Sequence, residues 1–156
     1  VQSLWLVFGL QGVLMWIVSL PVQVGSVADQ PASLGPVEIV GVIVYTVGIY
    51  FEAIGDFQLS QFKADPANAG KVMDRGFWRY TRHPNYFGDF CIWWGFYLIA
   101  ASAGGWWSMV GPALMTLLLL RVSGVALLEK DIGERRPAYA GYIRRTNAFF
   151  PGPRKA

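Results

Sequence analysis

Four runs of apolar residues divide this chain, and shorter polar segments separate them. The runs cover residues 4–24, 37–54, 86–103 and 106–128. Each is close to the length of about 20 residues that a helix needs to cross a bilayer. The alternation of polar and apolar residues that marks a membrane-spanning β-barrel strand is absent. Because the backbone inside lipid must satisfy its own hydrogen bonds, the pattern predicts four transmembrane helices.

Local signals refine the ends of these helices. Pro21 predicts a kink or an end in the first span, because proline has no amide N–H to donate. Gly104 and Gly105 leave room only for a very short turn, which makes the third and fourth spans an antiparallel hairpin. Pro84 fits the first turn of the third helix. Tyrosines three residues apart in the tail indicate a short interfacial helix that begins near Pro137.

The composition supports a lipid environment. Apolar residues make up 54% of the chain and charged residues only 15%, with a mean hydropathy of +0.37, which excludes a separate soluble catalytic domain. We expect residues 1–156 to form a single membrane domain. The chain starts with valine and has no basic segment before the first span, so we expect it to be the C-terminal part of a longer protein. One cysteine and one histidine predict no disulfide and no metal site.

The positive charges orient the predicted bundle. Of the 13 Lys and Arg residues, 12 lie either in the loop 55–85 or in the tail 129–156. The two opposite loops carry no Lys or Arg, so the positive-inside rule places the loop and the tail in the cytoplasm. The predicted fold is therefore all-α: a polytopic membrane bundle of four spans with a short cytoplasmic helix at its C-terminus. Basic residues so close to the bilayer indicate contact with membrane lipids, and we expect no nucleic-acid partner.

A first polar cluster lies at the end of the second span. Glu52 and Asp56 are four residues apart, so both carboxylates face the same side of a helix, and Gln58 follows them. Two like charges one turn apart repel each other and favour a nearby cation. The cluster is either a structural ion-pair site with the basic loop or part of a functional site, since ionisable groups beside a span are costly.

A second cluster surrounds the start of the third span. Asn85 and Asp89 fall one turn apart on one helix face, immediately after His83. A helix N-terminus flanked by Arg79 and Arg82 suits a phosphate or another anion. The structural alternative has His83 as a helix cap, the arginines as interface anchors and Asp89 as their counter-ion.

A third cluster lies in the tail. Glu129 begins it, and Tyr139, Tyr142 and Arg145 follow at helical spacing. Aromatic rings beside arginines can hold a flat, anionic nucleotide, and they can equally form an aromatic belt at the membrane surface. Glycine-rich dinucleotide fingerprints, a P-loop, an HExxH motif and a serine elbow are all absent from the sequence.

These segments together resemble a known group of membrane proteins. The run Arg82-His83-Pro84-Asn85-Tyr86-Phe87-Gly88-Asp89 is the most specific part. With the Glu52-x-x-x-Asp56-x-Gln58 element and the tail from Leu127 to Pro151, it resembles the C-terminal part of the steroid 5-alpha-reductase-like proteins. The similarity is greatest to their bacterial branch of unassigned substrate, and the superfamily also includes the sterol C14 reductases.

The resemblance implies an NADPH-dependent oxidoreductase that reduces the carbon–carbon double bond of a lipophilic enone, steroid-like or isoprenoid-like. It assigns cofactor binding to Asn85, Tyr86 and Asp89, with Arg79, Arg82 and His83 at the entrance for the phosphates. In the tail it adds Glu129, Tyr139, Tyr142 and Arg145 to the cofactor site. It places Glu52, Asp56 and Gln58 close to the nicotinamide or ribose end of the cofactor, where they support the residues that contact it. It implies no proton donor within this chain.

A second enzyme class remains open. Isoprenylcysteine carboxyl methyltransferase and the phospholipid methyltransferases share the Tyr-x-x-Arg-His-Pro-x-Tyr element and bind S-adenosylmethionine. The Arg79–Pro84 segment alone does not separate the two classes. Asn85 and Asp89 favour the reductase, because the methyltransferases usually lack that asparagine and that acid. A membrane module that keeps the cofactor pocket without a reaction is a third reading.

Overall fold

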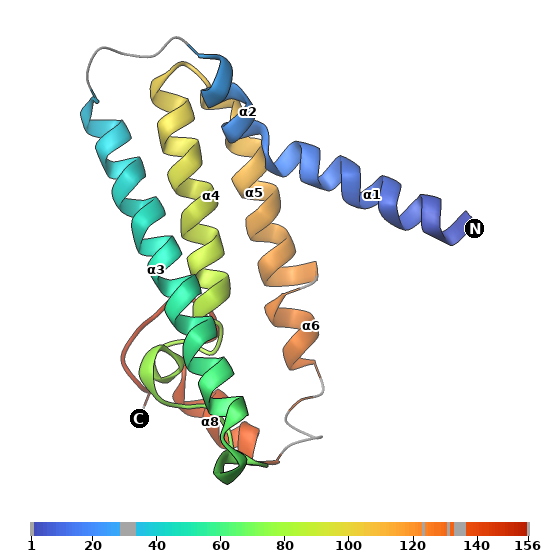
Figure 1. Cartoon of the computed structure of the whole chain (residues 1–156), viewed down its shortest axis with the longest axis vertical. Helices are drawn as coiled ribbons and strands as arrows, with labels where there is room; N and C mark the ends of the chain where they lie inside the picture. Colours follow the sequence, from blue (N-terminus) through green and yellow to red (C-terminus); the bar gives the residue numbers. More distant parts are fainter. Residues whose placement is uncertain (1, 29–33, 123, 131, 133–136, 156) are drawn as a thin grey trace. The chain divides into compact units, whose positions relative to one another are not determined.

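A computed structural model describes residues 2–28, 34–122, 124–130, 132 and 137–155 (Figure 1). Within these ranges the chain is helical, without β-strands. The α-helices are α1 (Gln2–Val18), α2 (Leu20–Val27), α3 (Pro36–Ala64), α4 (Pro84–Ser102), α5 (Val110–Leu117), α6 (Val125–Glu129) and α8 (Pro137–Arg145). Shorter turns are η1 (Pro66–Asn68), η2 (Gly76–Arg79), η3 (Trp106–Met109) and the π-helical η4 (Leu118–Val122). The all-α prediction is confirmed for the described residues.

Two of these segments are long and apolar enough to cross a membrane: α3 and the segment Trp106–Glu129. The pair α1 and α2 is a third if the two helices form one bent span. Helix α4 does not reach the same apolarity, because its first turns are polar and its middle is rich in Trp and Tyr. The chain is therefore a membrane protein with two to three candidate spans. The fourth span, and the side of the membrane that the loop and the tail face, stay predictions.

Helix α3 extends ten residues past the predicted end of the second span. Its 29 residues measure about 43 Å at 1.5 Å per residue, more than the roughly 30 Å of a bilayer core. The extension ends at Asp65 and Pro66, since the residue before a proline is disfavoured in the helical conformation. Asp65 then caps η1 by accepting a hydrogen bond from the amide of Ala67. Glu52, Asp56 and Gln58 consequently belong to one continuous helix.

The Cα positions form two compact units, Val1–Tyr45 with Trp93–Thr116 and Thr46–Ile92 with Leu117–Ala156. In the first unit the predicted break at Pro21 is confirmed, because α1 and α2 meet at a bend of 50°. The short turn after α4 is also confirmed, and Gly104 adopts a φ of +87° there, which favours glycine. Trp94 of α4 donates a hydrogen bond of 3.1 Å to Thr116 of α5, as expected for a helical hairpin.

Glycines let α3 and α4 approach closely in both units. In the second unit, a Cβ atom placed on Gly88 would lie 2.5 Å from the amide nitrogen of Glu52, and one on Gly48 would lie 2.7 Å from the carbonyl oxygen of Gly88. In the first unit, a Cβ on Gly95 would lie 2.7 Å from the amide nitrogen of Tyr45. These distances leave no space for a side chain. Small residues at such contacts are typical of helix packing in membranes.

The second unit contains the start of α4 and the tail. In Figure 1 the red tail returns to the green loop that precedes α4. Aromatic side chains join these segments: Phe77 stacks on Phe51 with centroids 4.4 Å apart, and Phe90 meets Phe149 edge to face at 5.7 Å. Helix α8 begins at Pro137, as the sequence predicts.

Candidate functional site

The tail is hydrogen-bonded to the segment just before α4. The amide of Arg82 donates to the carbonyl of Asn147 at 2.9 Å, and Thr81 forms an isolated parallel bridge with Asn147. The hydroxyl of Thr81, a fully buried residue, donates to the carbonyl of Phe149 at 2.7 Å. The motif segment and the tail, 65 or more residues apart in sequence, are therefore one structural element.

Arg82 lies at the centre of this element and is 6% exposed. Its Nε and Nη2 atoms donate to the two carboxylate oxygens of Glu129 at 2.7 and 2.6 Å, a bidentate pair. Its Nη1 atom donates to the carbonyl of Ile143 at 3.0 Å and to the carbonyl of Thr146. The side chain of Arg82 thus links the segment before α4 to the end of α6 and to the end of α8.

His83 shares the same carboxylate. Its Nε2 atom lies 2.9 Å from Oε1 of Glu129, and its ring stacks on Tyr86 with centroids 5.4 Å apart and planes within 7°. The carboxylate can only accept, so Nε2 carries the proton. His83 is 5% exposed and directly precedes Pro84, which begins α4 as the sequence predicts. Glu129 therefore fixes the orientation of the histidine, and the histidine fixes the ring of Tyr86.

The next polar residues of the motif are more accessible. Asn85 and Asp89 are half-buried in the first turns of α4. Gly55 of α3 lies against this start, because a Cβ there would lie 3.2 Å from the Pro84 ring. The carboxylate of Glu52 is repelled by those of Asp89 and Asp56. The first and second predicted polar clusters are therefore close enough to interact electrostatically. Within the described residues no group of three acidic, histidine or cysteine side chains is arranged to hold a metal ion.

The remaining predicted residues have separate surroundings. Gln58 accepts a hydrogen bond from the amide of Phe77 at 2.9 Å, which anchors the loop to α3. Arg145 lies 3.8 Å from the carboxylate of Asp74, and both side chains are largely exposed. Arg79 is exposed at the end of η2. The structure thus joins Arg82, His83, Tyr86 and Glu129 in one cluster but gives Gln58 and Arg145 contacts outside it.

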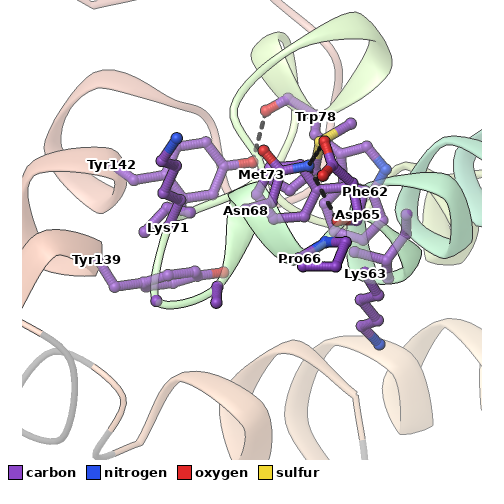
Figure 2. A pocket seen from close by; sticks show the side chains of 14 residues that line it. Phe62, Lys63, Asp65, Pro66, Asn68, Lys71, Met73, Trp78, Tyr139 and Tyr142 are labelled. Atoms are coloured by element: carbon purple, nitrogen blue, oxygen red, sulfur yellow. Dashed lines mark hydrogen bonds between the residues drawn. The ribbon is translucent and has the colours of Figure 1, made fainter.

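Tyr139 and Tyr142 line a pocket of about 390 Å³ within the second unit (Figure 2). Their rings meet edge to face with centroids 5.2 Å apart. The other lining residues lie outside the three polar clusters predicted from the sequence: Leu59, Phe62, Lys63, Asp65, Pro66, Asn68, Ala69, Gly70, Lys71, Val72, Met73 and Trp78. No local pattern in the sequence joins them to the tyrosines, because they come from residues 59–78 and meet Tyr139 and Tyr142 only when the chain folds.

Tyr142 and Trp78, which both line this pocket, are joined by a hydrogen bond. The hydroxyl of Tyr142 donates to the carbonyl of Trp78, and the indole Nε1 of Trp78 donates to the carbonyl of Gly55 at 3.0 Å. Tyr142 is 1% exposed. Burial raises the pKa of its phenol above the usual value, so the hydroxyl stays protonated and remains a donor over the physiological range.

We expect Tyr142→Phe to lower the free energy of unfolding by about 1–3 kcal/mol, because the buried carbonyl of Trp78 loses its donor. A raised pKa in the folded state gives stability that is fully present below the unfolded pKa of about 10 and is lost above it. The difference in the free energy of unfolding between wild type and variant should therefore shrink as the pH rises past about 10. Chemical denaturation in detergent at several pH values measures this, with the exposed Tyr80→Phe as control. A pH-independent difference would contradict the argument.

Comparison with known proteins shows a family. A family model described as a protein of unknown function, DUF1295, matches residues 1–146. The chain belongs to the DUF1295 family. This family is in the steroid 5-alpha-reductase-like group, which confirms the group that the motif indicated but not the bacterial branch.

The DUF1295 chain also has a curated relative. An uncharacterized protein of Schizosaccharomyces pombe is 30% identical over an aligned stretch of 111 residues, and the alignment covers 65% of this chain and 32% of that protein. The chain therefore spans about a third of the length of this relative. No solved structure matches the chain.

Proposed function

We propose that this DUF1295 protein is an integral membrane reductase that uses NADPH to reduce the carbon–carbon double bond of a lipophilic enone. Membership of the steroid 5-alpha-reductase-like group supports the proposal. We further propose the four-span bundle with its basic loop and tail in the cytoplasm, where NADPH would enter. The substrate class, steroid-like or isoprenoid-like, and the bacterial branch belong to the same proposal.

The observation that carries the proposal is the arrangement at the start of α4. Arg82 and His83 are held by Glu129 and by tail carbonyls, so they build the scaffold. Asn85, one residue further, is half-buried, and no hydrogen bond joins its side chain to another described residue. A primary amide offers both a donor and an acceptor, which is the set that a nicotinamide carboxamide can pair with.

The roles of the residues follow from this arrangement. NADPH supplies a hydride when it is bound. Asn85 orients the nicotinamide, and Tyr86, braced by His83, gives a flat wall beside it. Asp89 and Glu52, which lie close enough to repel each other, favour binding of hydroxyl groups of the ribose, because an ionised carboxylate only accepts hydrogen bonds. Arg79 and Arg145, both largely exposed, are available to phosphates.

We expect Asn85→Ala to weaken NADPH binding by about 1–3 kcal/mol, the cost of leaving a buried polar partner unpaired. The measurement is calorimetric titration of the full chain in lipid nanodiscs with NADPH, NADH and S-adenosylmethionine in parallel. Gln11→Ala, which removes an exposed amide of α1, is the matched control and should not change the affinity.

Two outcomes would contradict the proposal in different ways. Equal NADPH affinity of wild type and Asn85→Ala would remove this asparagine from the cofactor site. Binding of S-adenosylmethionine alone would replace the reductase by the methyltransferase alternative and direct the search to methyl acceptors.

A further inference from the structure

Arg121 is the one basic residue of the chain that lies outside the loop 55–85 and the tail 129–156. It is also the only charged residue of the sequence from Trp106 to Leu128, which belongs to a candidate membrane span. A charged side chain in the apolar core of a bilayer is costly unless a partner neutralises it, so such a residue is a functional candidate. The cofactor site proposed above does not use Arg121.

The helix changes its form at Arg121, which belongs to the π-helical segment η4. The amide of Gly124 donates to the carbonyl of Leu118 at 3.3 Å, six residues back, so this turn is wider than a turn of an α-helix. Gly124 suits this turn because a Cβ there would overlap the carbonyl oxygen of Leu119. Single π-helical turns occur frequently at functional sites. The candidate span therefore departs from regular α-helix at its one internal charge.

The side chain of Arg121 lies on the outside of the second unit. Arg121 is exposed, and in the described part of the chain it forms no ion pair. Leu119 and Val125 of the same segment are buried, whereas Leu117 and Val122 are 52% and 56% exposed. A guanidinium is thus presented among exposed apolar side chains, and a ligand that matches this surface has both an anionic group and an apolar body.

We propose that Arg121 binds the phosphate of an anionic phospholipid, whose acyl chains lie along exposed apolar side chains such as Leu117. Arg121 precedes the end of the span at Glu129 by eight residues, and a long arginine side chain can extend toward the polar interface. A guanidinium fork fits a phosphate with two parallel hydrogen bonds. An anionic headgroup also neutralises the charge, whereas a zwitterionic headgroup brings its own cation. This site is independent of the proposed reductase activity.

The first test is native mass spectrometry of the full chain in detergent, equilibrated with equal amounts of phosphatidylglycerol and phosphatidylcholine. The wild type should retain phosphatidylglycerol in preference, and Arg121→Leu should retain about tenfold less of it. Arg121→Lys should keep part of the retention because it keeps the charge but not the fork. The control is Lys155→Leu, which removes one positive charge from an exposed tail residue and should retain the lipid as the wild type does.

Thermal unfolding in the same detergent is the second test. Added phosphatidylglycerol should raise the unfolding temperature of the wild type but not that of Arg121→Leu, because a ligand that binds only the folded state stabilises it. The unfolding temperature of Arg121→Leu without lipid shows that this variant is folded. Glycerol 3-phosphate, which has no acyl chains, should not displace the lipid.

Four results would overturn the inference. Equal retention of phosphatidylglycerol by wild type and Arg121→Leu would remove Arg121 from the lipid site. Equal retention of the two lipids by the wild type would show that the headgroup charge is not recognised. Displacement by glycerol 3-phosphate would make the site one for soluble anions. Loss of a dimer in Arg121→Leu, with lipid retention unchanged, would give Arg121 a protein partner instead.

Discussion

Glu129→Gln is expected to lower the free energy of unfolding by about 3–5 kcal/mol. The neutral amide cannot satisfy the guanidinium of Arg82, which would then be a buried charge without its bidentate partner. The same substitution weakens the contact with Nε2 of His83. Breaking one member of a buried pair costs more than the pair itself contributes, because the remaining charge stays desolvated.

Chemical denaturation in detergent, followed by tryptophan fluorescence, measures this change. Lys130→Gln is the matched control, because it alters the exposed neighbouring residue and should change the free energy of unfolding by less than about 0.5 kcal/mol. If Glu129→Gln is as stable as the wild type but binds NADPH more weakly, Glu129 instead contacts the cofactor directly. A loss of stability with unchanged NADPH affinity in the folded fraction would make it a residue of the scaffold.

Gly88→Ala is expected to destabilise the protein by about 3 kcal/mol. The new methyl group would lie 2.5 Å from the amide nitrogen of Glu52 and 2.7 Å from the carbonyl oxygen of Gly48. Both neighbours are backbone atoms, so they cannot move away by a change of rotamer, and α3 and α4 must separate. Because interiors are close-packed, that separation loses contacts along the helix pair within this unit.

The control for this variant is Gly12→Ala in α1. No atom lies within 4 Å of a Cβ at Gly12, and alanine favours helix over glycine by about 1 kcal/mol, so this variant should be neutral or slightly stabilising. Thermal unfolding of both variants under the same conditions gives the comparison. Equal stability of Gly88→Ala and wild type would show that the close approach of α3 and α4 is not required.

Features encoded in adjacent residues could be predicted from the sequence. Pro21, Pro84 and Pro137 lie where helices break or begin, because the lack of an amide N–H acts within one turn. The apolar runs predicted a membrane protein, and the motif predicted the group to which its family belongs. Helix α3 continues ten residues beyond the end of the predicted span, a continuation that hydropathy does not indicate because those residues are mostly polar.

The partners of the site residues could not be predicted from spacing alone. Arg82 and Glu129 are 47 residues apart, and Thr81 and Phe149 are 68 residues apart. The sequence offered Asp89 as a counter-ion for the arginines, whereas the structure pairs Arg82 with Glu129. Several acidic residues could have neutralised the charge of Arg82, and the position of the tail in the folded chain determines which of them does.

The sequence by itself therefore determined the all-helical character, the membrane environment and the motif, since these depend on local hydrophobicity and on backbone preferences within a few residues. The tertiary structure alone decided which polar residues are scaffold and which remain accessible, and it created the pocket of Trp78, Tyr139 and Tyr142. The physical reason is that burying a charge or a hydroxyl is favourable only with a partner in place. Distant segments supply those partners when the chain folds.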